Sequence, residues 1–227
     1  MELPPAPLPC GVATELRPWM GPATEHPATA QPAAPPPAAA PAAAAADYRH
    51  VLKPTPAGWP RRQHWCVWVE PVADPDPTGI WERRWHGAVL AALTTWGRQL
   101  PITRVDDPAR AQVLVQRRRP PLQHNRASHG RALLQLVEVQ RGGPWQLEPR
   151  VEVLISPGQG PRGIQATALH ELGHAFGLWG HSDRAGDAMA AQPGGQPVLE
   201  LSPRDRATLR WLQQQPGLGE PPAPPRP

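Results

Sequence analysis

The chain has 227 residues, 23 basic and 19 acidic side chains, a formal net charge of +4 and only two cysteines. This length admits one domain of ordinary size or two small ones. No apolar run approaches the roughly 18 residues of a membrane span, and two cysteines are too few for a disulfide scaffold, so both of these classes are excluded.

Both ends of the chain are dominated by proline and alanine. Residues 1–46 contain 12 Pro and 15 Ala, and residues 216–227 contain 6 Pro. Such segments carry too few large apolar side chains to offset the entropy lost on ordering. We therefore predict disordered tails at 1–46 and 216–227, and one compact domain at 47–215.

The first half of this domain begins with a strand followed by a helix. Residues 64–70 are short, aromatic and β-branched, which predicts a strand, and residues 73–79 form a loop rich in Pro and Asp. Large apolar residues then recur at helical spacing, which predicts an amphipathic helix whose tryptophans face the core. They are Trp81, Trp85, Val89, Leu93, Trp96 and Leu100.

Four strands and two helices are predicted in the second half. Short runs rich in Val, Leu and Ile indicate strands at 102–105, 112–116, 132–139 and 151–155. A helix is expected from about Pro161 to Leu178. Another should follow Ser202, which suits an N-cap, with Pro203 at the first helical position and Asp205 completing a capping box. This order of elements predicts an α+β domain.

The positive charge is carried almost entirely by arginine, with 22 Arg and a single lysine, Lys53. Arginine runs at 61–62, 83–84 and 117–119 come without a nucleic-acid recognition motif. We interpret them as solvated faces and expect no nucleic-acid partner, so nucleic-acid binding is a remote third hypothesis.

The chemistry of the chain is concentrated after residue 169. His170, Glu171 and His174 form the pattern H-E-x-x-H, and residues four apart on a helix share one face, so the two histidines can bind one Zn²⁺. Gly177 suits the left-handed conformation that ends a helix, after which His181 can supply a third nitrogen. Three ligands leave one position for water, and Glu171 would act as general base on that zinc-bound water during attack on a carbonyl.

The surroundings of the motif favour this interpretation over a chance match. Leu169, Leu172, Phe176 and Leu178 are apolar, so the helix should be largely buried, and burying several imidazoles without partners is costly. We favour a catalytic zinc site over a purely structural one because the pattern offers three ligands rather than four.

From residue 164 to residue 212 the sequence resembles the metzincin metallopeptidases, in particular matrixin-like catalytic domains of bacterial type. The metzincin pattern H-E-x-x-H-x-x-G-x-x-H is matched at residues 170–177, while His181 falls one position later than the pattern asks. Ser182 follows the third histidine as in matrixins, and Met189 resembles their Met-turn methionine. Residues 201–205 resemble the start of the matrixin C-terminal helix, and residues 60–160 are compatible with the family.

This resemblance implies a zinc metalloendopeptidase with a twisted sheet above an active-site cleft. It assigns catalysis to Glu171 and zinc binding to His170, His174 and His181, with protein or peptide substrates; we expect a monomer. Family members are usually exported, so an extracellular or periplasmic location is implied, although residues 1–20 lack the apolar core of a signal peptide.

Three departures from the family pattern bear on this prediction. Ala190-Ala191-Gln192-Pro193 replaces the Tyr-Pro that usually follows the Met-turn, so an inactive zinc-binding module is the alternative function. A one-residue bulge at Gly180 could absorb the shift of His181, and Asp183 is the other candidate ligand nearby. His124 and His129 lack the Asp and Gly pattern of the family's structural metal loops, and we interpret them as surface histidines.

The two cysteines allow one bridge between a tail and the domain. Pro9-Cys10-Gly11-Val12 is faintly similar to the matrixin cysteine switch, but it lacks the Arg and Pro-Asp of that motif, and we favour coincidence. Cys66 lies in an apolar strand and is predicted to be buried and inert.

Overall fold

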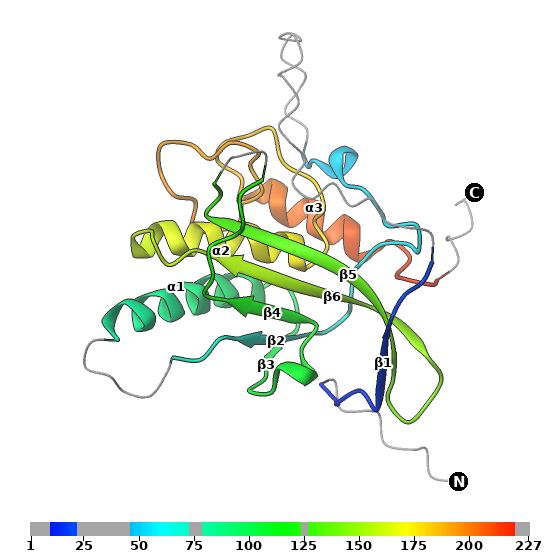
Figure 1. Cartoon of the computed structure of the whole chain (residues 1–227). Helices are drawn as coiled ribbons and strands as arrows, with labels where there is room; N and C mark the ends of the chain where they lie inside the picture. Colours follow the sequence, from blue (N-terminus) through cyan, green and yellow to red (C-terminus); the bar gives the residue numbers. More distant parts are fainter. Residues whose placement is uncertain (1–9, 22–45, 73–78, 124–126, 221–227) are drawn as a thin grey trace.

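The structure is a computed structural model that describes residues 10–21, 46–72, 79–123 and 127–220. Within these residues, six strands form one mixed sheet, accompanied by three α-helices and two short 3₁₀-helices (Figure 1). The fold is therefore α+β, as the order of predicted elements indicated.

Parallel strands make up most of the sheet, which has the order β1-β5-β6-β4-β2-β3. β2, β3, β4 and β6 run parallel to one another, β5 runs antiparallel to β6, and β1 runs antiparallel to β5. The bounds are β1 Glu15–Pro18, β2 Trp65–Val69, β3 Ile102–Arg104, β4 Val113–Gln116, β5 Gly130–Gln140 and β6 Gln146–Ile155.

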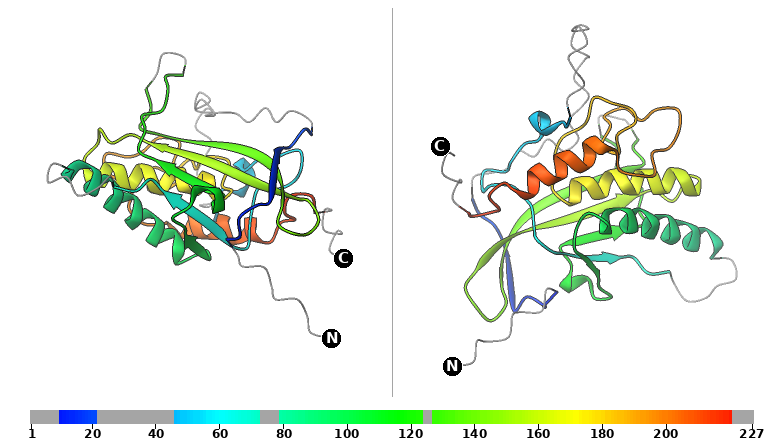
Figure 2. Two further views of the ribbon diagram at one scale, coloured as in Figure 1. Left: turned by 60° about the horizontal axis from the view of Figure 1, so that its bottom comes forward. Right: turned by 180° about the vertical axis from the view of Figure 1, so that it is seen from behind.

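All three α-helices lie on one face of the sheet (Figure 2). They are α1 Ile80–Gly97, α2 Pro161–Ala175 and α3 Pro203–Gln213, and the 3₁₀-helices are η1 Arg49–Val51 and η2 Pro108–Arg110. The core lies between the helices and the sheet. Two buried tryptophans of α1 donate hydrogen bonds to the neighbouring elements. Trp96 Nε1 donates to Leu169 O of α2 at 2.9 Å, and Trp85 Nε1 donates to Ile155 O of β6 at 3.2 Å.

The strands and helices predicted from residue 64 onward are all present. The capping box of α3 is also confirmed, because Ser202 Oγ accepts from Asp205 N while the Asp205 carboxylate accepts from Ser202 N. One core prediction is wrong: Trp81 is 65% exposed, and the Arg84 guanidinium lies over its ring. Trp81 sits in the first turn of α1, ahead of the part of the helix that packs on the core.

The sheet also includes residues assigned to the N-terminal tail. Residues 15–18 form β1 on the outer side of β5, and a disulfide joins Cys10 to Cys66 of β2. The ordered unit therefore begins before residue 47, whereas residues 1–9 and 22–45 of the predicted tail lie outside the described residues. At the other end, Leu218 packs on the core and Gly219 N donates to Ala57 O, so residues 216–220 belong to the domain.

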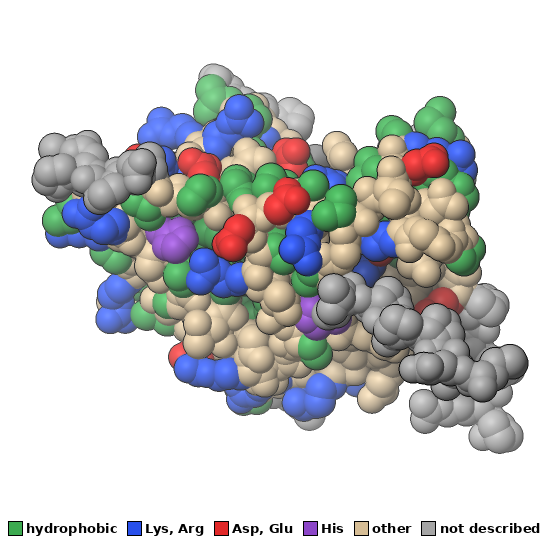
Figure 3. Space-filling model, turned by 90° about the horizontal axis from the view of Figure 1, so that it is seen from below, with side chains coloured by type: hydrophobic (Ala, Val, Ile, Leu, Met, Phe, Trp, Pro, Cys, Tyr) green, Lys and Arg blue, Asp and Glu red, His purple; other side chains and the backbone are tan. Residues whose placement is uncertain are grey.

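Two further properties concern the helices and the charged surface. Among the helices within the described residues, none has the length and apolarity to cross a membrane. On the face drawn in Figure 3, basic side chains lie in separate groups among acidic and apolar ones. Arg117, from the arginine run, pairs with Glu82 at 2.8 Å and with Glu70 at 3.6 Å.

Candidate metal centre

The C-terminal half of α2 carries His170, Glu171 and His174. The helix ends at Ala175, and Gly177 adopts a φ of +104°, as predicted for a helix-ending glycine. Gly177 N donates to His174 O and Leu178 N donates to Gly173 O, the pair of bonds that defines a Schellman motif. The chain therefore turns sharply back after the motif.

Two tight turns follow, over the three residues that separate Gly177 from His181. Trp179 N donates to Gly177 O, and Gly180 N donates to Leu178 O. A Cβ on Gly180 would lie 2.5 Å from the carbonyl oxygen of Val51, so a glycine is needed where this loop meets η1. After these turns, the side chain of His181 lies next to His170 and His174 on α2.

The three histidines converge on one point. Their ligand atoms all lie within 4.8 Å of one another, and His174 Nε2 is 3.2 Å from His181 Nε2. Zinc–nitrogen bonds of about 2.0–2.1 Å at tetrahedral angles place two ligand nitrogens about 3.3 Å apart. The separation within this pair is compatible with a shared zinc ion, and in the metal-free chain it corresponds to a hydrogen bond between the two imidazoles.

Backbone carbonyls fix which nitrogens face that point. His170 Nδ1 donates to Ala188 O at 2.9 Å, and His174 Nδ1 donates to Leu178 O at 2.8 Å. Because a carbonyl can only accept, each Nδ1 carries the proton and each Nε2 presents a lone pair in the neutral ring. Orientation of this kind, through the second ring nitrogen, is typical of histidines that bind metals.

Burial keeps these imidazoles neutral. It lowers the pKa of His170 to about 4, with His181 adding to the effect, and it lowers the pKa of His174 well below its usual range. Burial also lowers the pKa of His181. All three rings are therefore neutral at pH 7, which is the state that binds a metal ion.

We expect the metal-free protein to lose stability as pH falls from about 6.5 towards 4. In this range the unfolded chain protonates histidines that the folded chain keeps neutral, so each contributes stability that is present above its unfolded pKa and lost below it, at about 1.4 kcal/mol per pH unit. Glu171 acts in the opposite direction with one proton. Urea unfolding after chelation at pH 7 and pH 5 measures the slope, which should be shallower for His174→Gln; equal slopes would contradict the prediction.

Glu171 belongs to α2, and its side chain lies beside the histidine cluster and against the start of β5. Its carboxylate accepts a hydrogen bond from the backbone N–H of Ala132, yet burial dominates and raises the pKa of Glu171 to about 8. A Cβ on Gly130 would lie 2.7 Å from Glu171 Oε1 and 2.5 Å from Thr167 Cγ2. The absence of a side chain at Gly130 therefore makes the space that the Glu171 carboxyl group occupies.

The remaining candidate residues have other surroundings. Met189 is fully buried against α2, where a Cβ on Gly173 would lie 2.2 Å from Met189 Sδ. Asp183 is exposed and its carboxylate pairs with Arg204, and it is not among the residues that converge with the histidines. His129 belongs to no metal-ligating group within the described residues, and His124 lies outside them.

Cys10 is engaged elsewhere, in its bond to Cys66. In this structure it therefore does not occupy a position at the histidine cluster. Cys66 is fully buried as predicted, but it is bonded rather than free, and both sulfurs lie near His64.

Sequence reasoning identified the side chains that converge but not the groups that orient them. Three of the orienting groups belong to the backbone, namely the carbonyls of Leu178 and Ala188 and the N–H of Ala132. Every residue type other than proline carries both backbone groups, so the sequence does not show which of them will bind these side chains. A scan against models of known protein families matches none, and no curated protein matches the chain closely enough to be a relative.

Proposed function

We propose that the chain is a zinc-dependent metalloendopeptidase of the metzincin type, close to the matrixins. The observation that carries this proposal is the convergence of His170, His174 and His181, two of them oriented through Nδ1, beside the buried carboxyl group of Glu171. A glutamate next to the first of three histidine ligands is the arrangement of zinc peptidases.

A bound zinc ion supplies a Lewis acid that polarises a carbonyl and lowers the pKa of water. The protein supplies the rest. The three imidazoles present neutral nitrogens, and Glu171 accepts a proton from the attacking water and passes it to the leaving amine. Burial raises the pKa of Glu171 to about 8 in the metal-free protein, and the positive charge of a bound zinc ion would lower it again, so that the carboxylate form could accept a proton near neutral pH.

The edge of β5 supports extended polypeptides as substrates. β1 pairs with β5 only over residues 137–140, and Trp19 N donates to Leu136 O just beyond it. Among the described residues, no strand pairs with the outer edge of β5 from Gly130 to Gln135, next to Glu171. A peptide added as a further strand there would gain backbone hydrogen bonds and bring its own peptide bonds near the histidines.

The disulfide supports an exported protein. Bonds between buried cysteines form and persist in oxidising compartments and are rare in the cytosol. This supports the extracellular or periplasmic location that the resemblance implies.

Elemental analysis of the purified protein tests the metal. We expect one zinc per chain in the wild type, and a lower content with weaker affinity in His181→Ala, because two histidines hold zinc less tightly than three. His129→Ala is the matched control and should retain one zinc. A wild type without zinc would overturn the proposal, and a zinc content unchanged in His181→Ala would remove His181 from the ligand set.

A panel of unfolded protein substrates separates the peptidase from the alternative, a zinc-binding module without turnover. The replacement of Tyr-Pro by Ala190-Ala191-Gln192-Pro193 motivates that alternative. Cleavage that a chelator stops and added zinc restores supports the peptidase, whereas zinc-loaded protein that cleaves no substrate favours the module.

A further inference from the structure

The loop from Ser182 to Met189 joins the third histidine to the segment that packs beneath α2. It is closed at its base, because Ser182 N donates to Met189 O at 2.7 Å and Ala191 N donates to Ser182 O at 2.9 Å. Ser182 immediately follows His181 in the chain. Fixing the Ser182 backbone therefore restricts where the backbone of His181, and with it the imidazole, can lie.

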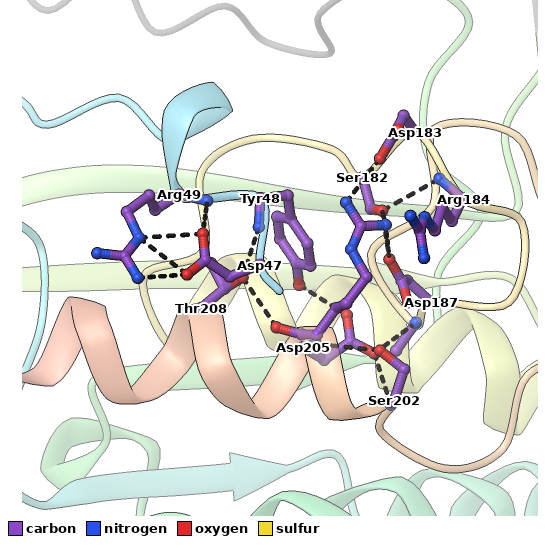
Figure 4. A network of polar contacts seen from close by, with 12 residues as sticks. Asp47, Tyr48, Arg49, Ser182, Asp183, Arg184, Asp187, Ser202, Asp205 and Thr208 are labelled. Atoms are coloured by element: carbon purple, nitrogen blue, oxygen red, sulfur yellow. Dashed lines mark hydrogen bonds and ion pairs between the residues drawn. The ribbon is translucent and has the colours of Figure 1, made fainter. Parts of the chain in front are cut away.

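Arg204, in the first turn of α3, donates hydrogen bonds to three side chains of this loop. They are Ser182, Asp183 and Asp187, which are labelled in Figure 4. One guanidinium nitrogen donates to Asp187 Oδ2 at 2.7 Å and to Ser182 Oγ at 3.2 Å, and the other donates to Asp183 Oδ1 at 2.8 Å. Ser182 Oγ also donates to Asp187. The guanidinium group thus contacts the residue next to His181 and both acidic residues of the loop.

The Arg204 side chain is buried, and the residues around it are hydrogen-bonded to one another. The side chain is 7% exposed, and its guanidinium lies over the Tyr48 ring at 5.6 Å. The neighbouring Asp205 accepts from Tyr48 Oη at 2.6 Å and from Ala188 N at 2.8 Å. A planar guanidinium that is always charged and offers several donors in a fixed fork suits this position, whereas the point charge of a lysine does not.

We propose that Arg204 is a positioning residue for the third metal ligand, acting through Ser182 and Asp187 to keep His181 aimed at the point where His170 and His174 converge. This inference rests on the proposed function. The extra residue lies in the hydrogen-bonded turns at 177–180, on one side of His181, and Arg204 acts on the other side, at Ser182.

A purely structural ion pair would stabilise the fold without acting on one ligand, and a double-mutant cycle separates the two roles. The four proteins are wild type, Arg204→Lys, His181→Ala and the double variant, each as the full chain. The measured quantity is the dissociation constant for Zn²⁺ at pH 7, by competition with a chromophoric chelator. Arg98→Lys is the matched control, because Arg98 pairs with Glu200 at the surface.

We expect Arg204→Lys to weaken zinc binding about 10- to 100-fold, the usual effect of losing a group that orients a ligand, and Arg98→Lys to leave it unchanged. In the His181→Ala background the same Arg204→Lys change should alter the constant less than about twofold, because the ligand it positions is gone. Wild-type affinity in Arg204→Lys, or an undiminished effect in the His181→Ala background, would overturn the positioning role alone.

If Arg204→Lys fails to fold by circular dichroism, Ser182→Ala takes its place in the cycle. It removes only the hydroxyl through which the guanidinium reaches the residue next to His181. A loss of zinc affinity that vanishes in the His181→Ala background supports the proposal, and unchanged affinity overturns it. Tight zinc binding without any hydrolysis would instead overturn the peptidase and leave the role of Arg204 standing.

Discussion

Replacing Glu171 with Gln is expected to lower kcat/KM for peptide hydrolysis by about 10²- to 10⁴-fold, the range that one positioned general base contributes. The amide matches the carboxyl group in size, and its carbonyl oxygen can still accept the Ala132 N–H, so the packing against Gly130 is retained. What is lost is the ability to take a proton from water. Because Glu171 is not one of the converging ligands, the zinc content should stay at one per chain.

Glu152 provides the matched control, since it lies exposed on β6, away from the histidines. Glu152→Gln should hydrolyse the same substrate at the wild-type rate. Measuring kcat/KM beside zinc content in all three proteins distinguishes a lost base from a lost metal. Full activity in Glu171→Gln would show that another group accepts the proton, and loss of zinc in that variant would mean that Glu171 supports the metal site instead.

The parts of the fold that could be predicted are those whose signal is local. The capping box at Ser202 and Asp205 and the helix-ending Gly177 are specified by residues within a few positions of one another, and both occur as expected. The six apolar positions from Trp81 to Leu100 follow a helical period, and five of them are buried in the structure. Trp81 alone is exposed, because periodicity indicates which face of a helix a residue lies on but not whether that turn of the helix is covered by the core.

β1 could not be predicted for the opposite reason. Its four residues, Glu15 to Pro18, are all exposed and have no apolar alternation, so nothing in them marks a strand. The strand exists because β5 offers an edge and because Cys10 is tied to Cys66, and both partners lie far away in sequence. The only signal was the presence of two cysteines, which permitted a bridge without requiring it.

The same division applies to the candidate metal centre. The side chains of His170, Glu171 and His174 follow from a four-residue motif, but their orientation depends on contacts across the domain. Ala188 O orients His170, and Ala188 is in turn held through its N–H by Asp205 of α3. The sequence does not distinguish Arg204 from the other 21 arginines, because its role depends on the ion pair with Asp187 that the fold brings about.

Reduction of the Cys10–Cys66 disulfide is expected to lower the free energy of unfolding by about 4 kcal/mol. The bond spans 56 positions, and closing a loop of that length removes this much entropy from the unfolded chain. Such a loss is a large share of the roughly 5–15 kcal/mol that a typical domain has. The pairing of β1 with β5 offers little compensation, because all four residues of the strand are exposed and Leu16 is its one large apolar side chain.

Urea unfolding of the wild type with and without a dithiol reductant measures this loss on a single sequence. Cys10→Ala serves as the control: it should unfold like the reduced wild type, and the reductant should leave it unchanged. Thiol titration of the oxidised protein under denaturing conditions should find no free cysteine among the two in the chain. Two free thiols would contradict the bond itself, whereas a bonded protein that loses less than about 1 kcal/mol on reduction would mean that the bond constrains the unfolded chain far less than its loop length predicts.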